Sequence, residues 1–168
     1  MPDNISLEKL HHVVQIGFGW DNTEDFEFTA FGYTISNHNY NEKNTDIPSK
    51  ELLIRDIFTD VREKIYYNYN LFNNWIHAIR LEAIVPFSNK NCICLSGKNS
   101  IPLEESGNIS GHNNLVRAFF STDSILRQQL DFVSEDFNPL YFNLLETNER
   151  LAKIENYIRS WERIRIKA

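Results

Sequence analysis

The sequence predicts an α+β fold: a mixed, mostly antiparallel sheet built around a central hairpin, with helices packed on one face and a long C-terminal helix. Two observations predict this class. Residues 65–82 alternate apolar and polar side chains, which is typical of paired, half-buried strands. Residues 145–166 instead repeat apolar side chains at helical spacing. Because 168 residues can bury one core, we expect a single domain over residues 1–168.

Charge is distributed unevenly along the chain. The net charge is −6, but the residues from Arg150 onward include six basic and two acidic side chains, a local charge of +4 that leaves −10 for residues 1–149. An acidic body disfavours a broad nucleic-acid surface, because phosphate contacts need clustered cations. Because the residues from Arg150 onward are basic, a small nucleic-acid binding site in this region is kept as an alternative. Its candidate residues are Arg150, Arg159, Arg163 and Arg165.

The two cysteines, Cys92 and Cys94, are separated by one residue, which is too close for an ordinary disulfide framework. A structural zinc site would need a second pair of ligands at matching spacing, and the sequence has none. Two small buried thiols are therefore favoured, and we expect no metal and no cofactor. The sequence shows no signal peptide and no run of about 18 apolar residues, so we expect a cytoplasmic protein without membrane contact.

The first element expected is a helix that begins after the N-cap Ser6 and ends at Gly17 and Gly19. Its apolar residues place His11 beside the buried stripe and His12 toward solvent. Successive helical residues point in different directions, so an adjacent histidine pair rarely binds one metal. A surface or half-buried histidine is the favoured interpretation of both.

Strand signals follow the first helix. Residues 25–30 alternate strictly, with Phe26, Phe28 and Ala30 inward, and Gly32 then indicates a turn. Residues 36–49 are rich in Asn and charge and predict an exposed loop. Residues 50–61 fit a short strand followed by a helical turn.

The hairpin itself has one strand with Ile65, Tyr67 and Tyr69 on one face. Its second strand runs to about Val85, where Pro86 stops the ladder. That strand carries Trp75, His77, Ile79 and Leu81 on one face. The turn, residues 70–73, has asparagine at both ends, which tolerates turn geometry.

The remaining chain predicts a long loop and several helices. Residues 87–111 form the loop, and helices are expected over residues 112–120 and 123–130. Asn138 before Pro139 indicates a helix start, and the last helix is expected over residues 145–166.

Candidate sites are few, and each has a structural alternative. His77 and Glu82 lie five residues apart and point to opposite faces of a strand, so a hydrogen-bonded core histidine is favoured over a catalyst. Glu104 and Glu105 lie on a glycine-flanked loop and could bind a metal or perform acid–base chemistry. The favoured alternative is that Glu104 accepts backbone N–H groups and holds the loop against the sheet. No P-loop, nucleophile elbow or zinc-protease motif is present.

Four stretches carry a resemblance to a known family. They are Leu10–Trp20 (LHHVVQIGFGW), Tyr67–Glu82 (YNYNLFNNWIHAIRLE), Cys94–Gly111 with its PLEESG segment, and Asp136–Leu151 with its DFNP start. In their order and residue types they resemble the pRiA4b ORF-three-like family of plasmid and mobile-element passenger proteins. The resemblance covers about residues 3–152 and leaves residues 153–168 as an extension. It implies an α+β fold and no assigned activity.

This chain departs from the family pattern in ways that affect function. The hairpin turn has asparagine, leucine, phenylalanine and asparagine at residues 70–73 where the family has D-F-G-D, and residues 24–26 replace a frequent H-L-H. If the family performs chemistry with the acids of the turn and with those histidines, this chain lacks it. The family also has an N-terminal strand before the first helix, and this chain begins after it. Two explanations are open: either the sheet lacks a strand and has an open edge that could pair with a partner or a second copy, or the chain is a truncated product.

Three functions follow from these observations. The leading hypothesis is a non-catalytic binding module of bacterial plasmid or mobile-element origin with a protein partner. Its binding residues would be Trp20, Trp75, His77, Glu104, Glu105 and Gly107. The first alternative is a metal-dependent hydrolase or nuclease that uses His11, His77, Glu104 and Glu105. The second alternative is nucleic-acid binding through the basic C-terminal helix.

Overall fold

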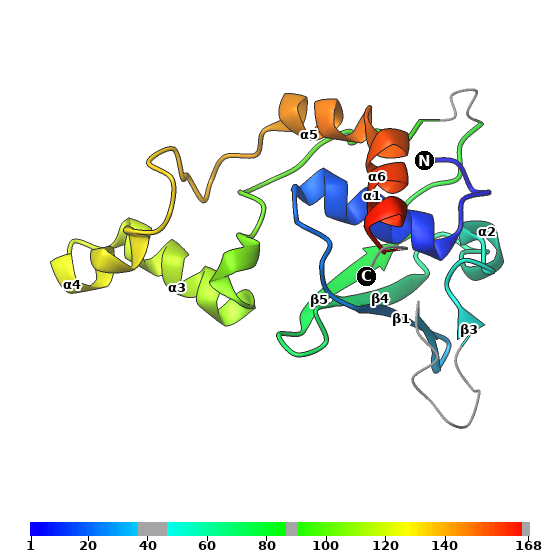
Figure 1. The fold of residues 1–168 in the computed structure, drawn as a ribbon, viewed down its shortest axis with the longest axis horizontal. Helices are drawn as coiled ribbons and strands as arrows, with labels where there is room; N and C mark the ends of the chain where they lie inside the picture. The colour runs from blue at the N-terminus through cyan, green and yellow to red at the C-terminus, as the bar shows by residue number, and fades with distance from the viewer. Residues whose placement is uncertain (37–46, 87–90, 166–168) are drawn as a thin grey trace.

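The computed structural model describes residues 1–36, 47–86 and 91–165 (Figure 1). A five-stranded sheet has the order β3-β2-β1-β4-β5. Its strands are β1 (Phe26–Ala30), β2 (Tyr33–Ser36), β3 (Ile47–Pro48), β4 (Lys64–Tyr69) and β5 (Trp75–Arg80). Strands β2 and β3 are parallel, and the other neighbours are antiparallel. The predicted α+β class with a mixed, mostly antiparallel sheet is confirmed.

The predicted hairpin consists of β4 and β5, with Tyr67 opposite His77 and Tyr69 opposite Trp75. It forms one side of the sheet and not its middle, because β4 pairs on its other edge with β1, which takes the central position. The turn is made possible by Asn70 and Asn74, whose φ angles of 53° and 57° lie in the left-handed region that asparagine tolerates. Strand β5 ends at Arg80, five residues before the expected Val85.

The helices divide into a part that covers the sheet and a part that projects from it (Figure 1). Helix α1 packs on the sheet, and α5 and α6 pack on α1. Helices α3 and α4 with the short helix η2 project away, and we call residues 109–130 the helical arm. The helices are α1 (Leu7–Phe18), α2 (Ile54–Ile57), η1 (Glu104–Ser106), α3 (Ile109–Phe120), α4 (Ser124–Arg127), η2 (Gln128–Leu130), α5 (Leu144–Leu151) and α6 (Ile154–Arg165).

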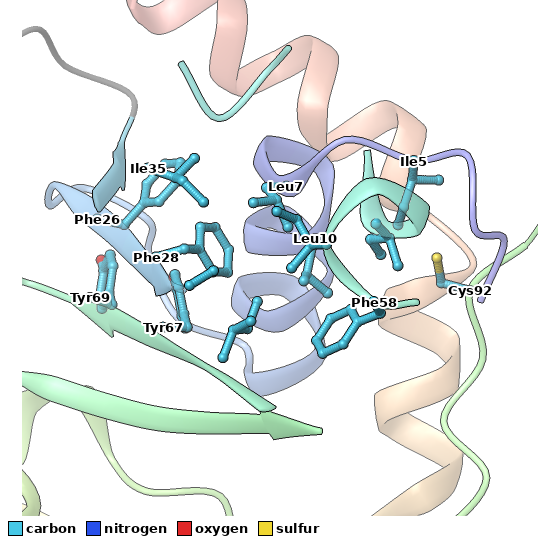
Figure 2. Packing of buried hydrophobic residues seen from close by; sticks show 14 of the residues in the cluster. Ile5, Leu7, Leu10, Phe26, Phe28, Ile35, Phe58, Tyr67, Tyr69 and Cys92 are labelled. Carbon is cyan, nitrogen blue, oxygen red and sulfur yellow. The ribbon is translucent and has the colours of Figure 1, made fainter. Parts of the chain in front are cut away.

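The core lies between α1 and the inner face of the sheet (Figure 2). Phe28, Tyr67 and Tyr69 project from the strands toward Leu7 and Leu10 of α1, and all five side chains are almost completely buried. This is the face that the period-two pattern predicts for each strand. Burial of aromatic side chains of this size contributes a large share of the hydrophobic stabilisation, about 25 cal/mol for each Å² removed from water.

Both ends of α1 are capped as the sequence indicates. The Ser6 hydroxyl accepts the Lys9 N–H, and Gly19 takes φ 75° after the last turn. The last turn of α1 contains no basic residue. Arg150 of α5 supplies the missing cation, because its guanidinium donates to the carbonyls of Ile16 (3.1 Å) and Gly17 (2.8 Å). Capping of one helix by a side chain of another therefore fixes α5 against α1.

The expected single helix over residues 145–166 is wrong, because α5 and α6 are separated at Ala152 and Lys153. The Lys153 N–H bonds to the Arg150 carbonyl at 3.0 Å in a tighter turn than the α-helix uses. Neither glycine nor proline marks this break. Leu151 and Ile154 keep one apolar face toward Ile16 across it, so the helical pattern continues through the interruption.

The expected helix start at Asn138 and Pro139 is also wrong. Asn138 instead makes a single turn, in which its side-chain oxygen accepts the Leu140 N–H at 3.0 Å. The next helix begins at Leu144, after Asn143 as N-cap. A local hydrogen bond of the asparagine side chain thus competes successfully with helix formation.

Smaller differences concern boundaries. Helix α3 begins at Ile109 and not at residue 112, because Asn108 caps it. The helix expected over residues 123–130 is divided into α4 and η2. Residues 54–57 form the helical turn expected in residues 50–61, but the strand lies earlier, at β3. Gly32 completes the β1–β2 turn with φ 82°. Most of the expected loop 36–49 lies outside the described residues.

Replacement of Arg150 tests the capping of α1. We expect Arg150→Met to lower the free energy of unfolding by about 1–3 kcal/mol, because two carbonyls at the end of α1 lose their charged donor. The matched control is Arg159→Met, since Arg159 is exposed on α6 and its loss should change stability by less than about 0.5 kcal/mol. Urea unfolding of the three proteins measures the difference, and equal losses for both variants would contradict the capping role.

Candidate functional site

Two groups of polar and aromatic side chains lie on the inner face of the sheet, and the Tyr67 ring lies near a histidine of each group. That ring lies 5.7 Å from the ring of His11 and 5.6 Å from the ring of His77. The first group belongs to α1 and is closed inside the core. The second group surrounds Trp20 and Glu104 and reaches the molecular surface.

The first group is a hydrogen-bonded cluster around His11, which is completely buried. Its Nδ1 lies 2.6 Å from the Tyr67 hydroxyl, and its Nε2 lies 2.5 Å from Oδ1 of Asn22. The Gln15 amide also donates to the Tyr67 hydroxyl, at 2.9 Å. Burial raises the pKa of Tyr67, so this phenol stays protonated and can donate to His11. Both ring nitrogens of His11 are thus held by neighbours inside the core.

His12 was expected to point toward solvent, and that expectation is wrong. Only 2% of its surface is exposed, because α6 crosses this side of α1. The imidazole packs edge-on against Trp161 with ring centres 4.7 Å apart. The Trp161 indole N–H in turn donates to the Asn22 carbonyl at 3.0 Å. Helix α6 therefore closes the buried cluster from the side opposite the sheet.

The second group begins with a clasp, which we define as residues 101–107. The Glu104 carboxylate accepts the Asp21 N–H (2.7 Å) and the Tyr69 hydroxyl (2.8 Å). The Trp20 indole N–H donates to the Pro102 carbonyl at 2.9 Å. Burial and the Glu104 carboxylate together raise the pKa of Tyr69, which keeps its hydroxyl as a donor. The bond from the Asp21 N–H is of the kind that the structural alternative for Glu104 predicts, and the bond from the Tyr69 hydroxyl joins the loop to β4.

A shallow cavity of about 170 Å³ lies where the clasp meets the end of α1. Phe18, Gly19, Trp20 and Asp21 line one side, and residues 101–105 line the other. Glu105 is exposed beside this cavity, whereas both oxygens of Glu104 are engaged in the clasp.

The glycines of the clasp region have structural explanations. A Cβ on Gly111 would lie 1.9 Å from the Ser106 carbonyl oxygen, so only glycine lets the clasp approach the first turn of α3. Gly107 takes φ 82°, which redirects the chain from η1 into α3. The two glycines thus set the point at which the helical arm leaves the body.

Trp20 connects the clasp to the hairpin. Its ring centre lies 5.0 Å from that of Trp75, 5.4 Å from that of Tyr69 and 5.5 Å from that of His77. His77 is half-buried, and its Nδ1–H donates to the Trp75 carbonyl at 2.9 Å. Burial lowers the pKa of His77, so the imidazole is neutral near pH 7. The predicted residues Trp20, Trp75, His77 and Glu104 therefore meet, while His11 belongs to the buried cluster, with its ring centre 6.2 Å from that of Tyr69.

Metal ligands do not gather anywhere in residues 1–36, 47–86 and 91–165: no group of three or more His, Cys, Asp and Glu side chains is placed to hold an ion. Cys92 is buried, and burial raises the pKa of its thiol. Cys94 is fixed through its backbone, because its N–H and carbonyl each bond to the side-chain amide of Asn148 at 2.9 Å.

The basic residues of the C-terminal region have different environments. Arg150 is committed to the end of α1 and to an ion pair with Glu146. Arg159 and Arg163 are exposed on α6, and Arg165 is the last residue of that helix. On the first turn of α6, Glu155 pairs with Lys9 of α1.

Sequence reasoning assigned no role to Gln15 and Asn22, which complete the buried cluster, or to Asn148, which holds the backbone of Cys94. Gln15, Asn22 and Asn148 carry no catalytic signature, so only their side-chain amides indicate a hydrogen-bonding role. Gln15 had one available signal, since it lies four residues after His11 and shares its helical face. Asn148 lies in the Asp136–Leu151 stretch that carries the family resemblance, but nothing there indicated Cys94 as its partner. Asn22 had no signal.

An α+β domain with a buried polar cluster and a clasped loop is thus the class of protein that the fold defines. Residues 1–146 match the model of the family described as Plasmid pRiA4b ORF-3-like protein. The chain belongs to this family, as the resemblance of its motifs indicated. The match ends in α5, so α6 lies beyond it.

Two individual proteins are similar to this chain. The uncharacterized protein y4hQ of Sinorhizobium fredii (strain NBRC 101917 / NGR234) is 25% identical over 122 residues, which are 70% of this chain and 62% of that protein. The chain thus matches less than two thirds of the length of this relative. The crystal structure of a protein of unknown function, MM3350 from Methanosarcina mazei Go1, has the same fold, with a TM-score of 0.72 and 23% identity over 86% of this chain and 84% of that chain.

None of the helices within the described ranges combines the length and the apolar character that a membrane crossing requires.

Substitution of Glu104 tests the clasp. We expect Glu104→Ala to lower the free energy of unfolding by about 1–3 kcal/mol, because the Asp21 N–H and the Tyr69 hydroxyl lose their acceptor. Amide exchange at Asp21 should accelerate. Glu105→Ala is the matched control, since this neighbouring carboxylate is exposed and should leave both measurements nearly unchanged. A clasp role would be excluded by an unchanged Asp21 exchange rate in Glu104→Ala.

The lowered pKa of His77 predicts a pH-dependent stability. In the unfolded chain this imidazole titrates near its ordinary pKa of 6.5, above its pKa in the folded protein. The unfolded state therefore binds the proton first as the pH falls, and stability declines below about pH 6.5. We expect His77→Gln to lose less stability than the wild type between pH 7 and pH 5. Urea unfolding at both pH values measures this, and an identical loss would contradict the assignment.

Proposed function

We propose that this protein is a non-catalytic protein-binding module whose binding surface consists of the exposed apolar side chains of the helical arm and of residues 131–145. The observation that carries the proposal is the number of large apolar side chains exposed there. Ile125 is 72% exposed, and Phe132 is 63% exposed. Exposed apolar residues that gather in one region are typical of protein interfaces. The residues concerned are Ile109, Phe120, Ile125, Leu126, Phe132, Leu140, Tyr141, Leu144 and Leu145.

The engagement of the reactive side chains supports a role without catalysis. His11 is enclosed in the core, and both oxygens of Glu104 are occupied by the clasp. A catalytic acid or base must reach the proton that it transfers. The metal-dependent hydrolase alternative would need His11 and Glu104 to share one metal ion, but both ring nitrogens of His11 and both oxygens of Glu104 already have hydrogen-bond partners within the protein.

The clasp residues have a positioning role in this proposal. Trp20 and Trp75 are 5% and 2% exposed, so they cannot supply much contact area to a partner. They hold the clasp, and Gly107 then directs the chain into α3. Among the residues predicted for binding, Glu105 is exposed at the base of the arm and is the one that a partner on the arm could contact.

Nucleic-acid binding receives less support from the charges. One of its four candidate arginines, Arg150, caps α1 and pairs with Glu146. The remaining exposed cations of α6 are too few for strong phosphate binding by an otherwise acidic chain.

Site-specific photo-crosslinking in the source cells tests the proposal. We expect a photoreactive amino acid at Ile125 to form a defined protein adduct. The matched control is the same amino acid at Ile84, which is 69% exposed on the body of the molecule. Ile125→Asp should abolish recovery of the same protein with the intact chain and leave unfolding unchanged within about 0.5 kcal/mol. Equal labelling at both positions, or labelling at Ile84 alone, would refute an interface on the arm.

A further inference from the structure

The two edges of the sheet differ in how far they are protected against pairing. Strand β3, at one edge, has two residues, and one of them is Pro48. Strand β5, at the other edge, has six residues with no proline and one charge, on Arg80. Short strands, prolines and charges are the usual means by which edge strands avoid association. The β5 edge has little of this protection.

The hydrogen bonds of the hairpin define which backbone groups face this open edge. The Leu81 N–H donates to the Glu63 carbonyl at 3.0 Å. Because bonding direction alternates along an antiparallel strand, Ile79, His77 and Trp75 also direct their N–H and C=O groups toward β4. The N–H and C=O groups of Ile76, Ala78 and Arg80 therefore point outward. Within the described part of the chain, no strand pairs with β5 on that side.

We propose that this edge pairs with the β5 edge of a second copy of the chain, antiparallel and centred on Ala78. The three outward residues are symmetric about Ala78, so a two-fold axis through that residue pairs all of them. Ile76 of each copy lies opposite Arg80 of the other, and the two Ala78 residues lie opposite each other. The ladder contains about six main-chain hydrogen bonds, two for each pair. A continuous ten-stranded sheet results.

Side chains on the outer face fit this register. Ala78 is small at the axis and lies beside Tyr66 of β4, whose ring is 43% exposed. Ile76, 62% exposed, covers the aliphatic part of the opposite Arg80. The two Arg80 residues lie four positions apart along the ladder. At the usual rise per residue of a strand, this separation is roughly 14 Å. This exceeds the Debye length of about 8 Å, so their repulsion is weak.

Side chains on the inner face of the sheet also favour pairing of the β5 edge with a second copy of the chain. His77 and Ile79 are half-buried, although the residues opposite them on β4, Tyr67 and Ile65, are almost fully buried. In the proposed register His77 lies opposite Ile79 of the second copy, and this contact completes their burial. The surface involved is separate from the helical arm, so the proposal is independent of the proposed function.

Proline at residue 78 provides an edge-specific test. The Ala78 N–H points away from β4, so Ala78→Pro removes a donor of the intermolecular ladder and spares the hairpin. By sedimentation equilibrium we expect the full-length wild type to approach twice the chain mass of 19.8 kDa as its concentration rises. Ala78→Pro should raise the dimer dissociation constant roughly tenfold or more. Ala78→Val keeps the N–H and should remain dimeric.

A charge pair tests the register and does not depend on folding of the proline variant. Ile76→Lys places a cation opposite Arg80 of the second copy and should weaken the dimer, whereas Ile76→Glu places an anion there and should preserve it. A wild type that stays monomeric up to millimolar concentration overturns the proposal. So does a dimer that Ile76→Lys and Ile76→Glu affect equally, or one that only Ile125→Asp dissociates.

Discussion

The hydrogen bonds that converge on the Tyr67 hydroxyl fix the position of α1 on the sheet. His11 and Gln15 both contact this hydroxyl in a core from which water is excluded. A buried polar group without a partner costs about 1–3 kcal/mol, so rotation of α1 or a shift along its axis would leave several such groups unsatisfied. Apolar packing alone would tolerate more positions. The polar contacts thus specify one position of α1 on the sheet. This position also determines where the elements that pack on α1 lie.

The connection between α1 and β1, residues 19–25, transmits this arrangement to the rest of the molecule. Trp20 and Asp21 receive the clasp, and Asn22 joins His11 to the Trp161 indole of α6. Segments that are far apart in the sequence therefore meet on one short connection. Because η1 leads directly into α3, the direction in which the helical arm leaves the body also depends on this connection.

Local patterns predicted the elements whose stability is local. Period-two alternation identified the inner faces of β1, β4 and β5, and the caps Ser6 and Gly19 identified α1. Burial of His12, the central place of β1 and the interruption after α5 could not be predicted, because each depends on contacts between distant segments. Asn138 shows a different limit: one side chain can cap a helix or close a turn, and neighbouring packing decides between them. Structural roles for His77 and Glu104 could be inferred from the sequence, because a buried carboxylate or imidazole needs hydrogen-bond partners.

The same constraint does not extend to the hairpin turn, which forms without acids or glycine at residues 70–73. Asn70 supplies the left-handed conformation, and its side-chain oxygen accepts the Asn73 N–H at 3.0 Å, so the turn forms without glycine. Phe72 at its tip is 94% exposed and contributes nothing to the buried cluster. The side-chain hydrogen bond of the turn joins two turn residues to each other, whereas His11, Gln15 and Tyr67 depend on one another. Function that differs between related proteins would therefore reside on exposed surfaces such as the turn, the arm and the sheet edge, and the polar core would serve to hold those surfaces in place.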